Sequence, residues 1–452
     1  MNRIALLIFI ILLFFGRYFL IRAKKKSAKY LWISFFILST PLQFEFSLNY
    51  LNPNDIQGVW GKVINVSVPL ILALLFFGYF RWKKLHSILG KNQWILYILL
   101  VLIISMLNPY NVDSFATFCF IFYFISLIGF FILASFKLSK AEIFDGLFDA
   151  LRILCSIQVI LAICFPLLKL SFVTELFHGK VAAEWATRMN TRVGAVGLFV
   201  HPGNLALFTI LASSFFLATY LNGYRTKLSL FLLACNVPTI ILTYSRTSYL
   251  AFVLVVSIVY FFHKFRYQNL LSVSNILKFV VPTLLFLGWL VYFSPFSENF
   301  LKSDSSDMVE ARSIHFLIAL TIFTASPIIG VGVNTHLTFF DHNSSIQKML
   351  PAIQEFYTVN PIHNIHLIIL TETGLIGFVL WICFLFNSLA KAKKTIANTS
   401  QTTSIFSLTL VGFIFAYIIY GLTGWAPLSK GLLPFFLFMV FCFNTYEYEK
   451  KV

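Results

Sequence analysis

Long apolar stretches alternate with short polar or basic segments from one end of the chain to the other. A helix of about 18 or more apolar residues is long enough to cross ~30 Å of hydrocarbon. Because the bilayer core offers the backbone no water, such spans must be helices. The pattern predicts roughly 13 spans. Their approximate positions are 4–22, 30–47, 62–80, 93–107, 114–136, 147–168, 203–222, 228–244, 247–263, 273–295, 361–387, 403–423 and 429–445.

Basic residues fall mostly in alternate loops, which sets the expected orientation. Clusters such as Arg22 to Lys29, Arg81 to Lys91 and Lys391 to Lys394 lie on one side, and that side collects roughly 20 of the 34 lysines and arginines. The positive-inside rule assigns it to the cytoplasm. The sequence therefore predicts an all-α polytopic membrane protein of roughly 12–13 transmembrane helices, with its N-terminus outside and its C-terminus inside.

Two segments interrupt the apolar pattern, and both are expected on the outer face. The first is about 169–202, and the second, about 296–360, is the longest polar stretch in the chain. Within the second, Ala311 to Ala325 has the period of an amphipathic helix lying on the membrane or over a cavity. Residues 1–452 are thus expected to form a single integral membrane domain, with 296–360 as a long periplasmic loop that carries this helix.

Composition agrees with this class. The chain of 452 residues is 59% hydrophobic and only 11% charged, too little charge to cover a soluble protein of this size. The net charge of +17 is spread in loop clusters rather than along a basic stripe with interleaved aromatic residues, so no nucleic acid is expected as partner. The six cysteines lie inside apolar runs, so neither disulfides nor a cysteine metal site is indicated.

Arg246 lies in Tyr244-Ser-Arg-Thr-Ser248, a tip between two predicted spans with almost no loop. An arginine buried in a membrane costs about 2.5–3.5 kcal/mol on insertion scales, so it needs a partner or a wet cavity. Since a planar guanidinium binds phosphate oxygens in bidentate fashion, Arg246 favours a phosphate or diphosphate clamp. The alternative is an interfacial arginine that snorkels to the surface.

Three further arginines occupy the outer segments. Arg312 opens the expected outer helix in Glu310-Ala-Arg-Ser313, and Arg188 and Arg192 belong to Arg188-Met-Asn-Thr-Arg192. Taken alone, each is also explained as a solvated loop arginine, with Glu310 as the partner of Arg312. These arginines therefore indicate a functional site only when they are considered together with other residues.

His363, in Asn360-Pro-Ile-His-Asn364, marks the outer start of a span. A histidine there titrates near neutral pH and can act as a general base, although an interfacial polar residue explains it as well. Glu372 lies deeper in the same helix, where an ionisable group normally faces the protein interior. No tight zinc-ligand spacing occurs among the nearby histidines, so no metal is predicted; these are His336, His342, His363 and His366.

Four short motifs follow one another between about 190 and 380. They are Arg192 before Gly197-Leu-Phe199 and His201-Pro202; Ser245-Arg246; Arg312 followed by Pro327, Gly330 and Gly332; and His-Asn-x9-Gly-x-x-Gly at His363, Asn364, Gly374 and Gly377. In order, spacing and expected outer side, this set resembles the O-antigen ligase and O-antigen polymerase family of bacterial surface-glycan enzymes.

The resemblance implies a helical-bundle glycosyltransferase of the GT-C-like type that moves a glycan from undecaprenyl pyrophosphate to a hydroxyl, without metal or other cofactor. It implies catalytic roles for His363, as base, and for Arg312 and Arg246, which would hold the pyrophosphate. Substrate-binding roles, or support of the site, would fall to Arg192, Arg188, Asn364, Glu372 and His201. Attack opposite the pyrophosphate would invert the anomeric centre.

The leading hypothesis is a polymerase of O-antigen or related repeat units in the bacterial inner membrane, with its active site facing the periplasm. Its expected partners are the lipid-linked glycan donor, a glycan or lipid acceptor, membrane lipids and, as a further candidate, a chain-length regulator. A ligase that delivers glycan to lipid A-core or protein uses the same motifs. A transporter or flippase is the alternative from another class, but the chain lacks the paired repeats typical of transporters.

Overall fold

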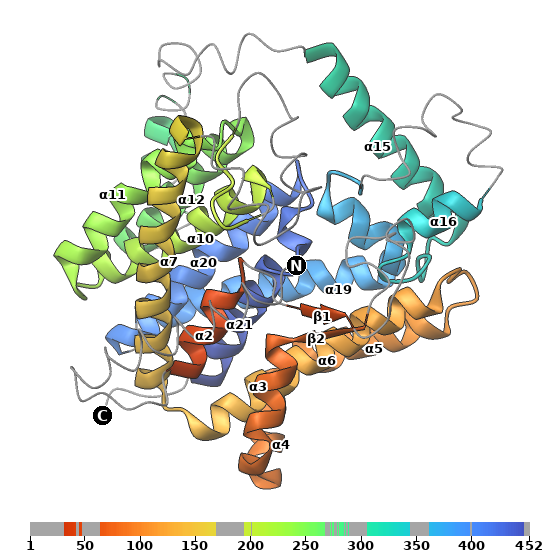
Figure 1. Cartoon of the computed structure of the whole chain (residues 1–452), viewed down its shortest axis with the longest axis horizontal. Coiled ribbons are helices and arrows are strands. Elements are labelled where there is room, and N and C mark those ends of the chain that lie inside the picture. Colours follow the sequence, from red (N-terminus) through yellow and green to blue (C-terminus); the bar gives the residue numbers. More distant parts are fainter. Residues whose placement is uncertain are drawn as a thin grey trace.

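The computed structural model is a helical bundle with one small two-stranded sheet in the part of the chain that it describes (Figure 1). The described residues are 31–41, 45–47, 64–168, 194–199, 201–266, single positions between 272 and 288, 305–343, 361–397 and 400–446. The expected span 4–22 lies outside them, and so does most of 273–295.

The first elements are shorter than the spans expected at 30–47 and 62–80. They are α2 (Leu31–Ser39), β1 (Glu45–Ser47), β2 (Asn65–Ser67), α3 (Val68–Phe76) and the 3₁₀ turn η3 (Phe77–Tyr79). The strands pair antiparallel, with Glu45 opposite Ser67. Ser67 then caps α3 by accepting from the Leu70 N–H at 3.4 Å. The hydropathy pattern does not predict this sheet, because strands of three residues leave no periodic signal.

Four helices follow: α4 (Trp82–Lys91), α5 (Trp94–Leu107), α6 (Ser114–Lys137) and α7 (Lys140–Leu168). The chain bends by 85° between α4 and α5. α7 begins before the expected 147 because Ser139 and Glu142 form a capping box, in which the Ser139 N–H donates to Glu142 Oε2 at 2.9 Å and the Glu142 N–H donates to Ser139 Oγ at 3.3 Å.

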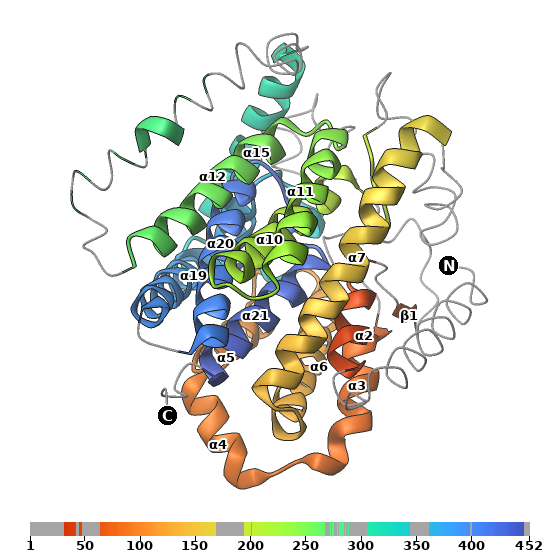
Figure 2. The same ribbon diagram turned by 90° about the vertical axis from the view of Figure 1, so that its left-hand side faces the viewer.

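The helices at the centre of the bundle have bounds that agree closely with the spans predicted from hydropathy. These are α10 (Pro202–Leu221), α11 (Thr226–Leu242), α12 (Arg246–Lys264), α20 (Gln401–Gly421) and α21 (Leu432–Tyr446). The short 3₁₀ turn η5 (Ala426–Leu428), which was not predicted, lies between α20 and α21. α10 packs against α11, α12 and α20 and lies in the middle of the view in Figure 2. Aromatic side chains fill the space between α20 and α21, where Tyr417 stacks on Phe436 with ring centroids 4.1 Å apart.

Three helices carry the second outer segment and the span after it. They are α15 (Ser305–Ala325), α16 (His336–His342) and α19 (Ile365–Ile396). A helix is therefore present over the expected 311–325 and starts earlier, at Ser305, but it is not amphipathic. Phe316, Leu317 and Leu320 are exposed, while Ile318 and Ile322 are buried. α15 runs along the outside of the bundle and leads to α16 beside one end of α19 (Figure 1). α16 is largely buried, so the chain after α15 returns into the protein.

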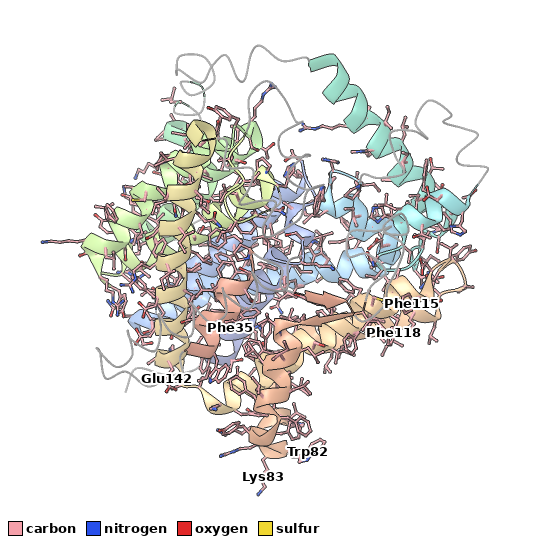
Figure 3. All side chains as sticks on the ribbon, viewed as in Figure 1. Phe35, Trp82, Lys83, Phe115, Phe118 and Glu142 are labelled. Carbon is pink, nitrogen blue, oxygen red and sulfur yellow. The ribbon has the colours of Figure 1, made fainter. Side chains whose placement is uncertain are left out.

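In the described residues, six helices are long and apolar enough to cross a membrane, or up to seven if the bent pair α4–α5 forms one span. Four shorter apolar helices accompany them, at Val68–Tyr79, Thr226–Leu242, Arg312–Ala325 and Leu432–Tyr446. Large apolar side chains such as Phe115 and Phe118 project outward from α6 (Figure 3), as expected of a lipid-facing surface. The predicted class, a helical multi-pass membrane protein, is confirmed.

Candidate active site

His363 lies directly before α19, and Asn364 fixes where that helix begins. The Asn364 side chain accepts hydrogen bonds from the His366 N–H at 2.9 Å and the Leu367 N–H at 3.1 Å, as an N-cap does. Its amide also donates to the Leu422 carbonyl at 3.3 Å, just beyond α20. The neighbouring asparagine thus holds His363 at a defined place between the start of α19 and the end of α20.

The tautomer of His363 follows from its hydrogen bonds. Its Nδ1 lies 3.0 Å from the Pro361 carbonyl oxygen, which can only accept, so Nδ1 carries the proton. The lone pair of the neutral ring therefore sits on Nε2. His363 is half-buried, and its backbone N–H donates to Nδ1 of His315 on α15 at 3.2 Å. The two rings stack with centroids 4.7 Å apart and an angle of 14°.

Burial keeps this group of imidazoles neutral. It lowers the pKa of His363 from 6.5, and the charge of Arg312 lowers it further, while the bond to Pro361 opposes the shift. The pKa of His315 falls to about 3 through burial and the charges of His363, Arg312 and His336. The pKa of His201 falls to about 4 through burial and the charge of His363. His201, Arg312, His315 and His363 therefore share one electrostatic environment, although they come from distant parts of the sequence.

The starts of α10 and α12 lie at the same end of the bundle. His201 caps α10 by accepting from the Gly203 N–H at 2.9 Å. A Cβ on Gly203 would lie 3.0 Å from the hydroxyl of Tyr420, near the end of α20. That hydroxyl is 3.4 Å from Ser248 Oγ in the first turn of α12. Arg246, the first residue of α12, thereby lies at the same end of the bundle as His201 and the start of α19.

Arg246 follows a tight hairpin. Tyr244 adopts a left-handed conformation with φ 51°, an uncommon choice for a bulky residue that concentrates at functional sites. The Ala195 N–H donates to the Leu242 carbonyl at 2.8 Å, so the described segment 194–199 docks beside this hairpin. Neither Arg246 nor Arg312 forms an ion pair with an acidic residue in the described part of the chain. A guanidinium binds phosphate oxygens in bidentate fashion, so both are candidates for contact with an anion.

α19, the helix that follows His363, is interrupted, and the chain segment after α15 pairs with the backbone at the interruption. Gly374, with φ 64° and ψ −167°, interrupts α19. The N–H groups of Val331 and Gly332 donate to the carbonyls of Thr371 and Glu372, both at 3.0 Å. Beyond the break, the N–H groups of Leu375 and Ile376 donate to the carbonyls of Pro327 and Ile328, at 2.9 and 3.2 Å. We call this backbone pairing of residues 327–332 with residues 371–376 the splice.

The splice explains why both segments need glycine. A Cβ on Gly330 would lie 2.3 Å from the carbonyl carbon of Glu372, and one on Gly374 would lie 2.4 Å from that of Ile328. Both contacts are with backbone, which cannot move aside. The Gly-x-Gly turn after Pro327 and the glycine eleven positions after His363 are thus two halves of one contact, which fixes the end of α15 relative to the start of α19.

The loop between α5 and α6 supports the turn from the other side. Asn108 Nδ2 donates to the Gly330 carbonyl at 2.6 Å, and Thr117 Oγ1 donates to the Val333 carbonyl at 2.8 Å. Asn111 Nδ2 donates to Thr117 Oγ1 at 2.9 Å. The sequence analysis did not single out these residues. The available signal was the cluster Asn108-Pro-Tyr-Asn-Val-Asp113, an uncharacteristically polar tip between two spans.

Glu372 is buried and paired with a residue that the sequence analysis considered only as a metal ligand. His336 Nδ1 lies 2.6 Å from Glu372 Oε1, and the two side chains are 1% and 9% exposed. His336 Nε2 has no hydrogen-bond partner among the described residues. The charge of His336 also acts on His315, so the pair lies behind the stacked histidines. No three potential ligands gather into a metal site in the described part of the chain.

The expected substrate-binding residues Arg188 and Arg192 lie outside the described residues. The remaining predicted site residues gather at one end of the bundle. His315 and His363 are in direct contact through a hydrogen bond and ring stacking. Arg312 and His201 lie close enough for charge to couple them to His363. Arg246 is connected to them through Ser248 and Tyr420.

Fold and site together define a multi-pass membrane protein with a histidine and two arginines, Arg246 and Arg312, gathered at one end of a helical bundle. Residues 228–382 match the family model described as O-antigen ligase, so this part of the chain carries the domain of that family, as the motifs predicted. The matched segment contains Arg246, Arg312, His363, Asn364 and Glu372. The search of the curated proteins gave no match. The family is one of glycan-transferring membrane enzymes of O-antigen ligase or polymerase type.

Proposed function

We propose that this protein is an inverting, metal-independent glycosyltransferase that polymerises undecaprenyl-pyrophosphate-linked repeat units into O-antigen or a related surface polysaccharide. The reaction takes place at the periplasmic face of the bacterial inner membrane. The observation that carries the proposal is the neutral imidazole of His363, whose Nδ1 is occupied by the Pro361 carbonyl and whose Nε2 lone pair remains for a substrate. The nearby charge of Arg312 supplies the complementary site for an anion.

In this reaction the acceptor hydroxyl oxygen attacks the anomeric carbon, and the bond from that carbon to the pyrophosphate oxygen breaks. The hydroxyl proton passes to Nε2 of His363. The negative charge that develops on the leaving pyrophosphate is stabilised by Arg312 and Arg246, because fixed cations in a water-poor site stabilise developing charge strongly. Arg192 and Arg188 are assigned to the same anion, and Glu372 orients His336 behind the site.

A ligase that transfers finished glycan to lipid A-core or protein is the second candidate, because the matching family model is described as a ligase. Surface polysaccharide from a strain lacking the protein distinguishes the two. Loss of long chains, with single repeat units still attached, is the result expected for a polymerase. Loss of all attached glycan would establish the ligase instead, and unchanged glycan would contradict both.

Arg246→Lys is expected to reduce transfer by about 10- to 100-fold, even though it keeps the positive charge. Lysine is a point charge and cannot reproduce the planar fork that binds two phosphate oxygens. The measurement is chain extension by purified protein supplied with lipid-linked repeat units. Arg266→Lys, just past the opposite end of α12, is the matched control and should retain full activity. Equal activity of the two variants would remove Arg246 from the pyrophosphate site.

A further inference from the structure

A cavity of about 590 Å³ lies between α5, α6, α19 and α21. Along α19 its wall continues from Ile368 to Lys391, well past the splice. The unbroken part of that wall, from Gly377 to Lys391, is about 21 Å long at 1.5 Å per residue. One leaflet of a bilayer has about 15 Å of hydrocarbon. The cavity is therefore long enough for an acyl chain of a membrane lipid.

The body of the cavity is apolar. Side chains from all four helices face it, and they include Ile98, Leu102, Phe124, Leu380 and Leu437. Such a wall suits hydrocarbon rather than a sugar or a nucleotide. Glu372 is the one acidic residue in the described lining, and it belongs to the end near the splice.

The end of the cavity away from Glu372 and the splice is basic. Lys91, at the end of α4, and Lys391, near the end of α19, both line the cavity and are half-buried. Neither forms an ion pair with an acidic residue in the part of the chain that the structure describes. Two amides, Asn387 and Asn444, line the cavity with them. Half-buried lysines that have no acidic partner among the described residues favour an anionic ligand.

Hydrogen bonds hold the residues at this basic end, which we call the mouth of the cavity, in place. Lys91 Nζ donates to the Thr445 carbonyl at 3.1 Å, and Asn92 Nδ2 donates to Thr445 Oγ1 at 3.2 Å. Trp94 Nε1 in turn donates to Asn92 Oδ1 at 3.0 Å. The turn between α4 and α5 is thereby tied to the end of α21, so Lys91 is positioned before any ligand arrives.

Two polar groups in the wall have no partner. Asn444 is 4% exposed, and its Oδ1 has no hydrogen-bond partner among the described residues. The indole N–H of Trp381 is also buried without one. Buried polar groups are nearly always satisfied, and those that are not call for a missing ligand or water. Both residues line this cavity, so a ligand with hydroxyl and carbonyl groups could satisfy them there.

α4 places the mouth at a membrane surface. The helix lies at 85° to α5 and carries Arg81, Lys83, Lys84 and the 77% exposed Trp82 at its start. Trp82 and Lys83 project from the tip of the molecule (Figure 3). A basic amphipathic helix with an interfacial tryptophan lies in the headgroup region and attracts anionic lipid.

We infer that the cavity between α5, α6, α19 and α21 binds one anionic phospholipid, with its phosphate between Lys91 and Lys391 and an acyl chain along α19 toward Trp381. The phosphate would lie at the end of the cavity opposite Glu372, away from the His363 loop. The cavity is a place where a lipid of the surrounding leaflet joins α4, α19 and α21 into one unit.

The test uses the tryptophans of the cavity as reporters. The full chain is reconstituted in phosphatidylcholine vesicles containing increasing fractions of brominated phosphatidylglycerol or brominated phosphatidylcholine, since bromine quenches a tryptophan that it touches. Trp94 and Trp381 line the cavity. Quenching should reach half its maximum at an about tenfold lower fraction of the anionic lipid, as expected for two lysines near a phosphate. Trp381→Phe should remove much of this lipid-selective quenching.

The matched control separates the site from general surface charge. Lys91→Gln with Lys391→Gln should abolish the preference, whereas Lys393→Gln with Lys394→Gln removes two exposed charges from the same helix end and should preserve it. Equal quenching of the wild-type protein by the two brominated lipids would overturn the proposal without reference to any variant. Loss of the preference in both double variants would also overturn it, because surface charge alone would then explain the selectivity.

Discussion

Replacing His363 with alanine is expected to reduce glycan transfer by at least about 100-fold while the protein still inserts and folds. General-base catalysis by a positioned side chain contributes about 10²- to 10⁴-fold. His363 is the described histidine whose Nδ1 is held by a backbone carbonyl while its ring stacks beside a neutral imidazole. The measurement is single-turnover extension of a lipid-linked acceptor, with helix content checked by circular dichroism.

The pH profile of the wild-type protein gives a second measurement of the same residue. Protonation of Nε2 removes the lone pair, so activity should be present while His363 is neutral and lost as the pH falls through its pKa. Burial lowers that pKa from 6.5, so the acidic decline should lie below pH 6.5. His342→Ala, which removes an exposed imidazole bonded to the Thr338 carbonyl, should leave rate and profile unchanged. Wild-type turnover by His363→Ala would show that another group accepts the proton.

Replacing Gly374 with alanine is expected to destabilise the protein by about 3 kcal/mol or more. The backbone of Gly374, at φ 64° and ψ −167°, belongs to a region that is open essentially to glycine alone. The added Cβ would also lie 2.4 Å from the Ile328 carbonyl group. The four hydrogen bonds of the splice would have to lengthen or break. Thermal unfolding in detergent should show a lower midpoint, and transfer should fall because α15 loses its position beside His363.

Gly129→Ala is the matched control for this change. Gly129 also lies in a long apolar helix, α6, but its added Cβ would meet only the Ala73 Cβ, at 3.9 Å. Alanine favours the helix by up to about 1 kcal/mol over glycine, so this variant should be as stable as the wild type or more so. Equal unfolding midpoints for the two alanine variants would contradict the account of the splice.

The spacing of the His-Asn-x9-Gly-x-x-Gly motif acquires a physical meaning from the splice. His363 stands before the first turn of α19, and Gly374 stands where the helix breaks to receive residues 327–332. The same contact that needs Gly374 sets the distance from α19 to the end of α15. α15 in turn presents His315 and Arg312 to His363. The motif is therefore a structural unit in which the base and its support are positioned together.

Hydropathy predicted most described helices within a few residues because lateral exposure to lipid imposes a continuous apolar run on each span. α6, α10, α12 and α20 agree closely with the expected 114–136, 203–222, 247–263 and 403–423. It overestimated α2, which ends at Ser39, because Leu42, Phe44 and Phe46 keep the hydropathy of the segment high beyond the helix. It could not show the break at Gly374, since a single glycine does not alter the average hydropathy of a long span.

Sequence alone determined the class of this protein, the approximate position of its helices and the family that residues 228–382 match, because apolar length and ordered motifs are properties of the chain itself. It also singled out Arg246, Arg312 and His363. Only the tertiary structure decided which nitrogen of His363 carries the lone pair, that His315 stacks on it, that His336 pairs with Glu372, and that two glycine segments form the splice. The tautomer follows from a local bond to Pro361 that hydropathy and motif spacing do not record. The other features depend on contacts between residues tens of positions apart, and no local pattern in the sequence records which distant backbone or ring a side chain will meet.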